Sequence, residues 1–248
     1  MHSILIIGQS NMGGRGFAKD VEPIKSERLY VLRNGRWRKM YVPVNPDRVT
    51  SGICLVESFA YQYSIDHDAN VGIIPCADGG TSLSQWMPGT LLFDHTCYMA
   101  ELATRTSTIA AVLWHQGESD CAEDREPLYK ERLTVIINAF RDKLGLHDVP
   151  FIVGGLGDFL VDHGERFALY YPKINEHLES MADDSQRIGF VSAKGLTDNG
   201  DNLHFSAPSL REFGLRYYQE FLRLEDKSKV FEERNTFDSG IVNALEVL

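Results

Sequence analysis

The sequence has no excess of basic residues and no long apolar run, and both absences restrict its function. Its 248 residues include 25 Lys and Arg against 35 Asp and Glu, which gives a formal net charge of -10. Because the basic residues are scattered, no basic stripe is available to neutralise phosphates, and we expect no nucleic-acid partner. The apolar stretch at residues 3–7 is too short for a signal-peptide core, and no run is long enough to cross a bilayer. We therefore expect a cytoplasmic protein with no membrane contact.

Cysteine is also scarce, and its spacing argues against the common cysteine sites. The four cysteines are Cys54, Cys76, Cys97 and Cys121. They form no Cys-x-x-Cys pair and have no histidine partners at metal-ligand spacing, so we predict buried free thiols and no metal or redox site. Cys121 closely follows Glu118, and a bystander thiol is the better interpretation of it than a nucleophile. His115 precedes Glu118 by three residues, but no further ligand set accompanies this pair, so it predicts no metal either.

Apolar runs and helical periodicity predict an α/β fold. With 43% hydrophobic residues, the chain can bury the core of one large domain. Apolar runs of strand length occur at residues 3–7, 71–75, 109–114, 150–154 and 188–192. Segments with a period near 3.6 occur at residues 52–66, 90–105, 127–144, 167–181 and 208–224. Because strands and helices alternate, we expect a parallel sheet that is covered by helices on both faces.

We expect this domain to span residues 1–224, with specificity loops in residues 12–39. Residues 225–248 form a tail that begins charged and ends apolar, from residue 241 onward. Such a tail is expected to pack on the domain or on a second subunit. The sequence therefore leaves both a monomer and a homo-oligomer open.

Three polar, glycine-containing segments each follow a predicted strand, and a fourth segment lies near the end of the domain. They are Gly8-Gln9-Ser10-Asn11-Met12, Ala77-Asp78-Gly79-Gly80-Thr81-Ser82, Trp114-His115-Gln116-Gly117-Glu118 and Asp201-Asn202-Leu203-His204-Phe205. Because ligand sites in such folds form beyond the carboxyl ends of the strands, we expect the first three segments to converge. Together the four segments contain a nucleophile, a base, an orienting carboxylate and candidate oxyanion donors. This combination is typical of a serine hydrolase.

The glycines around Ser10 also suggest a phosphate-binding turn, but their spacing argues against it. A dinucleotide fingerprint needs Gly where Ser10 stands, and a P-loop needs Lys and then Ser or Thr where Gly14 and Arg15 stand. The Gly-x-Ser-x-Gly elbow is also absent, since Met12 stands in place of its second glycine. Taken alone, Ser10 is more typical of a turn or a helix N-cap than of a nucleophile.

Asp201 and His204 form the most specific pair in the sequence. Because they lie three residues apart on a turn, the carboxylate can fold back to the imidazole and hold one tautomer, which leaves the other ring nitrogen free to accept a serine proton. The alternative interpretation is a surface turn at residues 199–202, with His204 capping the following helix. Ser10 and the glycine segments favour the catalytic interpretation.

These four segments, in this order, resemble the SGNH hydrolase superfamily, and within it the sialate O-acetylesterase-like group that includes carbohydrate esterase family six, the family related to acetylxylan esterases. The resemblance covers residues 3–222 and includes Trp86, which follows the Gly-Gly-Thr-Ser segment. It implies a three-layer α/β/α sandwich with a central parallel sheet and a flavodoxin-like SGNH hydrolase fold. It also implies hydrolysis of O-acetyl esters on small sugar substrates without a cofactor.

The resemblance assigns roles to individual residues. It makes Ser10 the nucleophile, His204 the general base and Asp201 its orienting partner. The implied oxyanion donors are the Ser10 amide, an amide of Gly79 or Gly80, and the Gln116 side chain. The wider superfamily has an asparagine at the position of Gln116, so the longer glutamine must approach from farther back.

Three further residues near these segments have two interpretations each. Glu118 either supports the catalytic histidine or pairs with Arg15 to fix the loop that carries Ser10. We favour the pairing with Arg15, because Asp201 has the better spacing for the histidine.

Trp86 and Phe159, on loops beyond predicted strands, are candidates for stacking against a sugar, with packing in the core or a loop as the alternative.

The predicted function is that of a serine esterase that removes O-acetyl groups from a carbohydrate through an acetyl-serine intermediate. Acetylated xylan, other acetylated oligosaccharides and sialic acids are the substrate types that the resemblance suggests. Two other functions stay open, hydrolysis of lipid or thioester acyl groups and a non-catalytic sugar-binding module. The complete set of Ser10, Asp201 and His204 argues against the binding module.

Overall fold

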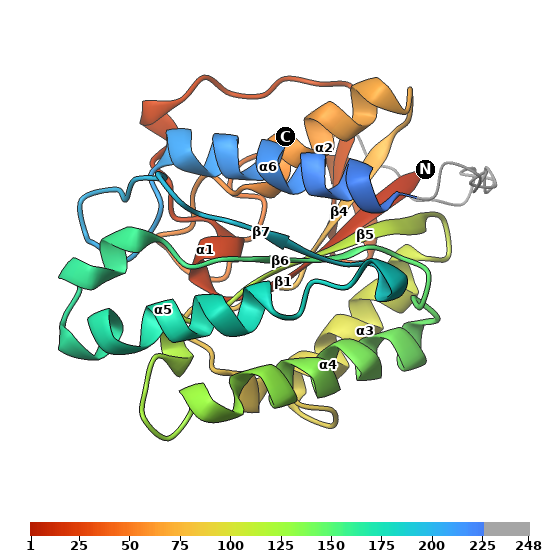
Figure 1. The fold of residues 1–248 in the computed structure, drawn as a ribbon. Coiled ribbons are helices and arrows are strands. Elements are labelled where there is room, and N and C mark those ends of the chain that lie inside the picture. The colour runs from red at the N-terminus through yellow and green to blue at the C-terminus, as the bar shows by residue number, and fades with distance from the viewer. Residues whose placement is uncertain (226–248) are drawn as a thin grey trace.

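A seven-stranded sheet runs through the centre of the molecule in the order β3-β2-β4-β1-β5-β6-β7 (Figure 1). The computed structural model describes residues 1–225. The strands are β1 (His2–Gly8), β2 (Leu29–Arg33), β3 (Arg36–Lys39), β4 (Val71–Pro75), β5 (Thr108–His115), β6 (Phe151–Gly154) and β7 (Ile188–Val191). Neighbouring strands are parallel except for the antiparallel pair β2 and β3. The parallel sheet that the sequence predicted is confirmed.

Long helices cover both faces of this sheet, so the fold has three layers (Figure 1). On one face lie α2 (Val56–Asp66) and α6 (Ala207–Leu224), and on the other lie α3 (Leu91–Ala103), α4 (Tyr129–Leu144) and α5 (Glu165–Glu179). Side chains along β1 alternate between the two layers, because successive residues of a strand point to opposite faces. Ile4 and Ile6 belong to the core beneath α2 and α6, whereas Leu5 and Ile7 belong to the core beneath the other three helices.

The strands that the sequence predicted, β4-β1-β5-β6-β7, have the flavodoxin-like order 2-1-3-4-5. The chain leaves β1 toward one edge of the sheet and leaves β5 toward the other, so a crevice opens between their carboxyl ends. The two strands approach closely there. Gly8 has a φ of +133°, and a Cβ at this position would lie 2.1 Å from the His115 carbonyl oxygen, so the site requires glycine.

The expected loop at residues 12–39 is wrong in part, because this segment contains the hairpin of β2 and β3. Its turn, Asn34-Gly35, has positive φ at both residues, which is typical of a type I′ turn. In β3 three of the four residues are Arg or Lys, so no apolar run marks the strand, and only Trp37 is fully buried. A charged edge strand of this kind has no strong sequence signal but resists pairing with other chains.

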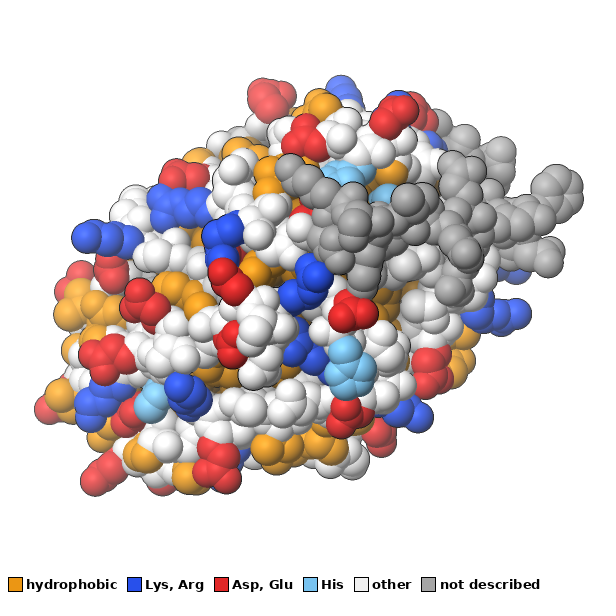
Figure 2. Space-filling model, turned by 45° about the vertical axis from the view of Figure 1, so that its right-hand side comes forward, with side chains coloured by type: hydrophobic (Ala, Val, Ile, Leu, Met, Phe, Trp, Pro, Cys, Tyr) orange, Lys and Arg blue, Asp and Glu red, His pale blue; other side chains and the backbone are white. Residues whose placement is uncertain are grey.

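The predicted tail at residues 225–248 lies outside the described residues, apart from Glu225. On the face that Figure 2 shows, acidic and basic side chains are intermixed rather than gathered by sign. Among residues 1–225, no helix has the length and apolar character needed to cross a membrane.

Candidate active site

Ser10 lies at the start of the short helix α1 (Ser10–Gly13), directly beyond β1. The turn is fixed by backbone hydrogen bonds, because the Gln9 amide donates to His115 O at 2.9 Å and the Gly13 amide donates to Gln9 O at 2.9 Å. The amides of the first helical turn have no acceptor within their own helix, so the Ser10 amide remains available for an external oxygen. Figure 1 shows α1 at the same end of the sheet as the loop between β7 and α6.

That loop brings Asp201 and His204 to Ser10. His204 Nε2 lies 3.1 Å from Ser10 Oγ, and His204 Nδ1 lies 2.7 Å from Asp201 Oδ2. Since a carboxylate oxygen can only accept, Nδ1 carries the proton and donates it to Asp201, which leaves Nε2 to accept from the Ser10 hydroxyl. The three side chains that the sequence singled out therefore form one continuous chain of hydrogen bonds.

Asp201 is held as a carboxylate by its neighbours. Its Oδ1 accepts from the backbone amides of His204 at 2.7 Å and Leu203 at 2.9 Å. Burial acts to raise the pKa of Asp201, but the hydrogen bonds from His204 and Leu203 outweigh it, so the pKa lies below its ordinary value. The group is thus ionised at neutral pH and able to stabilise a positive charge on the imidazole.

Asn11 fixes this loop onto α1. Its Oδ1 accepts from the Phe205 amide at 3.1 Å, and its Nδ2 donates to Leu203 O at 3.1 Å and to Glu118 Oε1 at 2.5 Å. The residues on either side of His204 are therefore both bound by one side chain. Sequence analysis missed this role, although Asn11 adjoins Ser10 in the first segment.

The predicted pairing of Glu118 with Arg15 is wrong. Glu118 is buried, accepts from Asn11, and lies 3.4 Å from His115 Nε2. Burial acts to raise the pKa of Glu118, but the His115 ring and the Asn11 amide lower it below its ordinary value. Glu118 makes no hydrogen bond to His204 among the described residues either, so its contacts are with the scaffold around the triad.

Arg15 instead pairs with Asp47, a residue that sequence analysis did not single out. Both side chains are buried, and the pair is bidentate, with contacts of 2.6 and 3.1 Å. Asp47 Oδ2 also accepts from the Gly79 amide at 2.8 Å. This bond engages the Gly79 amide, so Gly80 is the glycine of the two that stays a candidate oxyanion donor. The pair thereby ties the segment after β1 to the segment after β4.

Gln116 does not line the candidate catalytic pocket, the hollow beside Ser10, Gly80 and His204, which contradicts its expected place among the oxyanion donors. Its side chain is fully buried, and its Nε2 donates to Asp120 Oδ2 at 2.6 Å and to Thr81 O at 3.0 Å. Two acceptors behind the pocket thus hold the amide away from Ser10. Gln116 connects the loops after β4 and β5 instead.

Gln9 takes the place at the pocket that Gln116 was expected to fill. It lines the pocket beside Ser10, and its Oε1 accepts from the Ser119 amide and from Gln116 Nε2, both at 3.3 Å. These donors orient the amide so that its nitrogen is the free end, and no described residue accepts from this nitrogen. Its position directly before Ser10 was the available sequence signal.

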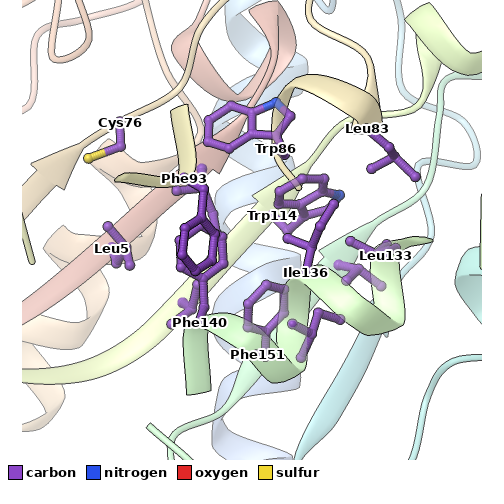
Figure 3. Close-up of a cluster of buried hydrophobic side chains, with 14 of the residues drawn as sticks. Leu5, Cys76, Leu83, Trp86, Phe93, Trp114, Leu133, Ile136, Phe140 and Phe151 are labelled. Atoms are coloured by element: carbon purple, nitrogen blue, oxygen red, sulfur yellow. The ribbon is translucent and has the colours of Figure 1, made fainter. Parts of the chain in front are cut away.

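Trp86 and Phe159 do not contribute stacking surfaces to the pocket, and the packing alternative is the correct one for both. Trp86 is fully buried and meets Trp114 edge-on, with ring centroids 5.6 Å apart (Figure 3). Phe159 is half-buried and packs edge-on against Phe205 at 5.0 Å. Aromatic pairs of this geometry are typical of protein cores.

The prediction of buried free thiols is confirmed for all four cysteines. Burial raises the pKa of the Cys76 thiol to about 12 and that of Cys97 to about 11, and it raises the pKa of Cys121 further above its ordinary value. Thiols of this kind are not nucleophilic at neutral pH. Within residues 1–225 no group of three His, Cys, Asp or Glu side chains is arranged to hold a metal ion.

The sequence matches a protein-family model described as carbohydrate esterase, sialic acid-specific acetylesterase, over residues 1–223. The chain belongs to this carbohydrate esterase family. A probable carbohydrate esterase of Arabidopsis thaliana is 28% identical over 242 residues, which cover 88% of this chain and 89% of the relative. The family predicted from the four segments is thereby confirmed.

Solved structures share the fold of this carbohydrate esterase. The crystal structure of the Arabidopsis thaliana protein has a TM-score of 0.81 at 25% identity, covering 90% of this chain and 98% of that chain. The structure of NanS has a TM-score of 0.69 at 17% identity, covering 90% and 97%. Lipolytic proteins of the G-D-S-L type are further structural neighbours. The predicted SGNH hydrolase fold is confirmed.

The candidate catalytic pocket is an open hollow of about 370 Å³ at Ser10. It is lined by Gln9, Ser10, Arg15, Arg48, Gly79, Gly80, Glu118, Ser119, His163, Arg166, Phe167, Leu203 and His204. Most of these residues are polar, and Phe167 and Leu203 are the hydrophobic side chains among them. The polar side chains offer hydrogen bonds to a hydroxylated ligand, while carbon atoms make up the larger share of the exposed lining.

Proposed function

We propose that this protein removes O-acetyl groups from a carbohydrate through an acetyl-serine intermediate. The observation that carries the proposal is the hydrogen-bonded chain Ser10–His204–Asp201 at the crevice between β1 and β5, in a member of a carbohydrate esterase family. A nucleophile that contacts a base, with the base oriented by a third group, is the arrangement that activates a serine hydroxyl.

In the proposed mechanism His204 is both base and acid. Its Nε2 takes the proton of Ser10 Oγ as the oxygen forms a bond to the acetyl carbonyl carbon, and Asp201 stabilises the resulting imidazolium. The tetrahedral intermediate then collapses, the bond to the sugar oxygen breaks, and His204 returns the proton to that oxygen. Water, deprotonated by His204, attacks the acetyl-serine, the bond from the acetyl carbon to Ser10 Oγ breaks, and His204 returns the proton to Ser10 Oγ as acetate leaves.

The negative charge on the former carbonyl oxygen needs hydrogen-bond donors. We assign this role to the amides of Ser10 and Gly80 and to Gln9 Nε2, because each belongs to the lining of the pocket and none has its hydrogen engaged by a described residue. Removing a single donor of this kind typically lowers turnover by about 100-fold or more. Substituting Gln9 should therefore affect turnover more than substrate binding.

The polar side chains of the pocket also favour an acetylated sugar over a long-chain lipid ester as the substrate. Arg48, Ser119, His163 and Arg166 present donors and acceptors around Ser10. Burying each further methylene of an acyl chain would require further apolar surface, and Phe167 and Leu203 are the hydrophobic side chains that line this pocket. Acetylated xylan, other oligosaccharides and sialic acids all remain within the proposed substrate class.

The proposal is tested with acetate release from O-acetylated sugars and with hydrolysis of p-nitrophenyl acetate. We expect Ser10→Ala and His204→Ala each to remove nearly all activity, and the double variant to be little worse than either, because residues that act as one unit are strongly non-additive. Losses that multiply would contradict a single catalytic unit. Wild-type protein that binds acetylated sugars without releasing acetate would favour the binding-module alternative.

A further inference from the structure

A second hollow, of about 260 Å³, adjoins the catalytic pocket, and no step of the proposed mechanism uses it. Its walls come from the segment at residues 45–48, the segment at residues 75–78, and Leu92 and His95 of α3. Drug-sized ligands typically occupy pockets of about 300–1,000 Å³, so this hollow suits a smaller group, such as one sugar ring.

The two hollows share a partition. Arg48 lines both of them, and the buried Arg15–Asp47 pair spans between them, with Arg15 on the catalytic side and Asp47 on the other. Arg48 is held in place because its guanidinium donates to Asp47 O at 2.8 Å and to Gly79 O at 3.0 Å. A ligand that crosses this partition therefore meets an ordered side chain.

The chemistry of the second hollow suits a polyhydroxylated ring. Arg48 Nη2 lies 2.9 Å from Asp78 Oδ1, and both side chains are partly exposed, at 51% and 33%. The pair has no net charge but presents guanidinium donors beside carboxylate acceptors, which together match hydroxyl groups that both donate and accept. Pro46 and Leu92 supply apolar surface for the carbon face of a ring, and His95 adds another polar group.

We propose that this second hollow binds a neighbouring sugar unit of the same substrate molecule whose acetyl group lies at Ser10. This inference rests on the proposed function and narrows it, since it makes an acetylated oligosaccharide the preferred substrate over an acetylated monosaccharide. The neighbouring unit contacts Arg48 across the partition and fills the space beside Leu92. Its binding energy is gained without any change in the acetyl-transfer chemistry.

The test compares kcat/KM for acetate release from matched substrates of different size. The probes are O-acetylated xylose against O-acetylated xylotriose, and free O-acetylated sialic acid against the same sugar linked to lactose. For the pair of sugars that the wild-type protein hydrolyses, we expect kcat/KM to be about tenfold or more higher for the larger member. This is the effect of one or two well-formed hydrogen bonds. Equal rates on both members would overturn the proposal.

Leu92→Trp should fill the second hollow and remove that preference while leaving p-nitrophenyl acetate hydrolysis at the wild-type rate. Leu91→Trp is the matched control, because Leu91 is the preceding residue of α3, is 83% exposed and lies outside the hollow. His95→Ala is a smaller change and should also reduce the preference for the larger sugar. It provides the test if Leu92→Trp fails to fold. A preference that survives both Leu92→Trp and His95→Ala would overturn the proposal.

Failure of the two proposals can be told apart. If the protein hydrolyses p-nitrophenyl acetate and releases acetate equally well from the small and the large acetylated sugar, the neighbouring-unit site is wrong and the esterase function stands. If neither acetylated sugar releases acetate at any size, the proposed function is wrong and the site falls with it.

Discussion

Two hydrogen bonds arrange Ser10, His204 and Asp201, and each has its own effect on His204. The 2.7 Å hydrogen bond to Asp201 fixes the tautomer of His204, and the 3.1 Å contact places the other nitrogen at Ser10. Single substitutions can therefore separate the roles of these residues.

Asp201→Asn and Glu118→Gln should separate the orienting carboxylate from the scaffold carboxylate. We expect Asp201→Asn to lower kcat roughly a thousandfold or more with the fold intact, because an amide does not enforce the required tautomer. Glu118→Gln should chiefly lower the melting temperature, since Glu118 contacts Asn11 and His115 rather than His204. The measurements are kcat on p-nitrophenyl acetate and thermal unfolding. A larger catalytic defect in a stably folded Glu118→Gln protein would reverse the assignment.

Residue type and spacing predicted the three residues of the hydrogen-bonded chain but not the partners of the residues around it. Asp201 and His204 are three apart, so their contact is local and visible in the sequence. Arg15 and Asp47 are joined by the path of the chain through two loops, which no spacing rule encodes. Gln116 was assigned by its place in the third segment, and the acceptors that turn its amide away come from other segments.

At the scale of elements, α1 and the loop before α6 behave as one unit because Asn11 binds both flanks of His204. Asn11→Ala should lower kcat by about 100-fold, the typical effect of displacing a catalytic group by 1 Å, with little change in KM. Asn199→Ala is the matched control, since Asn199 lies in the same loop and its side chain donates to Arg15 O instead. Steady-state kinetics of both variants decide the question. Equal defects would show that Asn11 has no special part in placing His204.

The segment after β4 is held by the Arg15–Asp47 pair, and the stability that this pair provides should depend on pH. Burial acts to raise the pKa of Asp47, but the Arg15 guanidinium outweighs it and lowers the pKa below the ordinary value of 3.8. Because the folded-state pKa is the lower one, the stabilisation is present above pH 3.8 and is lost as the pH falls through the folded-state value.

Asp47→Asn should therefore lower the free energy of unfolding at pH 7 by about 3 kcal/mol or more, because it leaves a buried guanidinium unpaired. The difference from wild type should shrink below about pH 4. Asp68→Asn, in the exposed pair Arg28–Asp68, is the control and should cost less than about 1 kcal/mol. Urea unfolding at several pH values measures both. A difference that grows toward low pH would contradict the assigned charge state.

The buried elements with a regular apolar pattern were predicted, whereas the β2–β3 hairpin was missed, although Asn34-Gly35 follows the apolar residues of β2. The predicted strand at residues 71–75 coincides with β4, and the five predicted helices overlap α2 to α6 with ends shifted by up to a few residues. These elements are buried, so their apolar pattern is strong. Strand β3 lies at the sheet edge with Arg and Lys on most positions, and only the Asn34-Gly35 turn signalled it.

At the scale of the whole molecule, the shape and polarity of the pocket should determine which esters are hydrolysed. We expect kcat/KM on p-nitrophenyl esters to fall steeply from acetate to butyrate and to be negligible for octanoate. Each methylene gains about 0.8 kcal/mol only where apolar surface can bury it, and here Phe167 and Leu203 are the hydrophobic lining residues. A profile that rises toward octanoate would favour the lipid or thioester hydrolase and leave the roles of Ser10 and His204 unchanged.

The most direct test of the central claim is labelling of the intact protein with a fluorophosphonate, followed by tryptic digestion and mass spectrometry. We predict a single adduct on the peptide of residues 1–15, assigned by fragment ions to Ser10 and not to Ser3, the other serine of that peptide. Acetate release from acetylated sugars should be lost in proportion to labelling. An adduct on another residue, or an unlabelled protein that still releases acetate, would contradict the claim that Ser10 is the nucleophile.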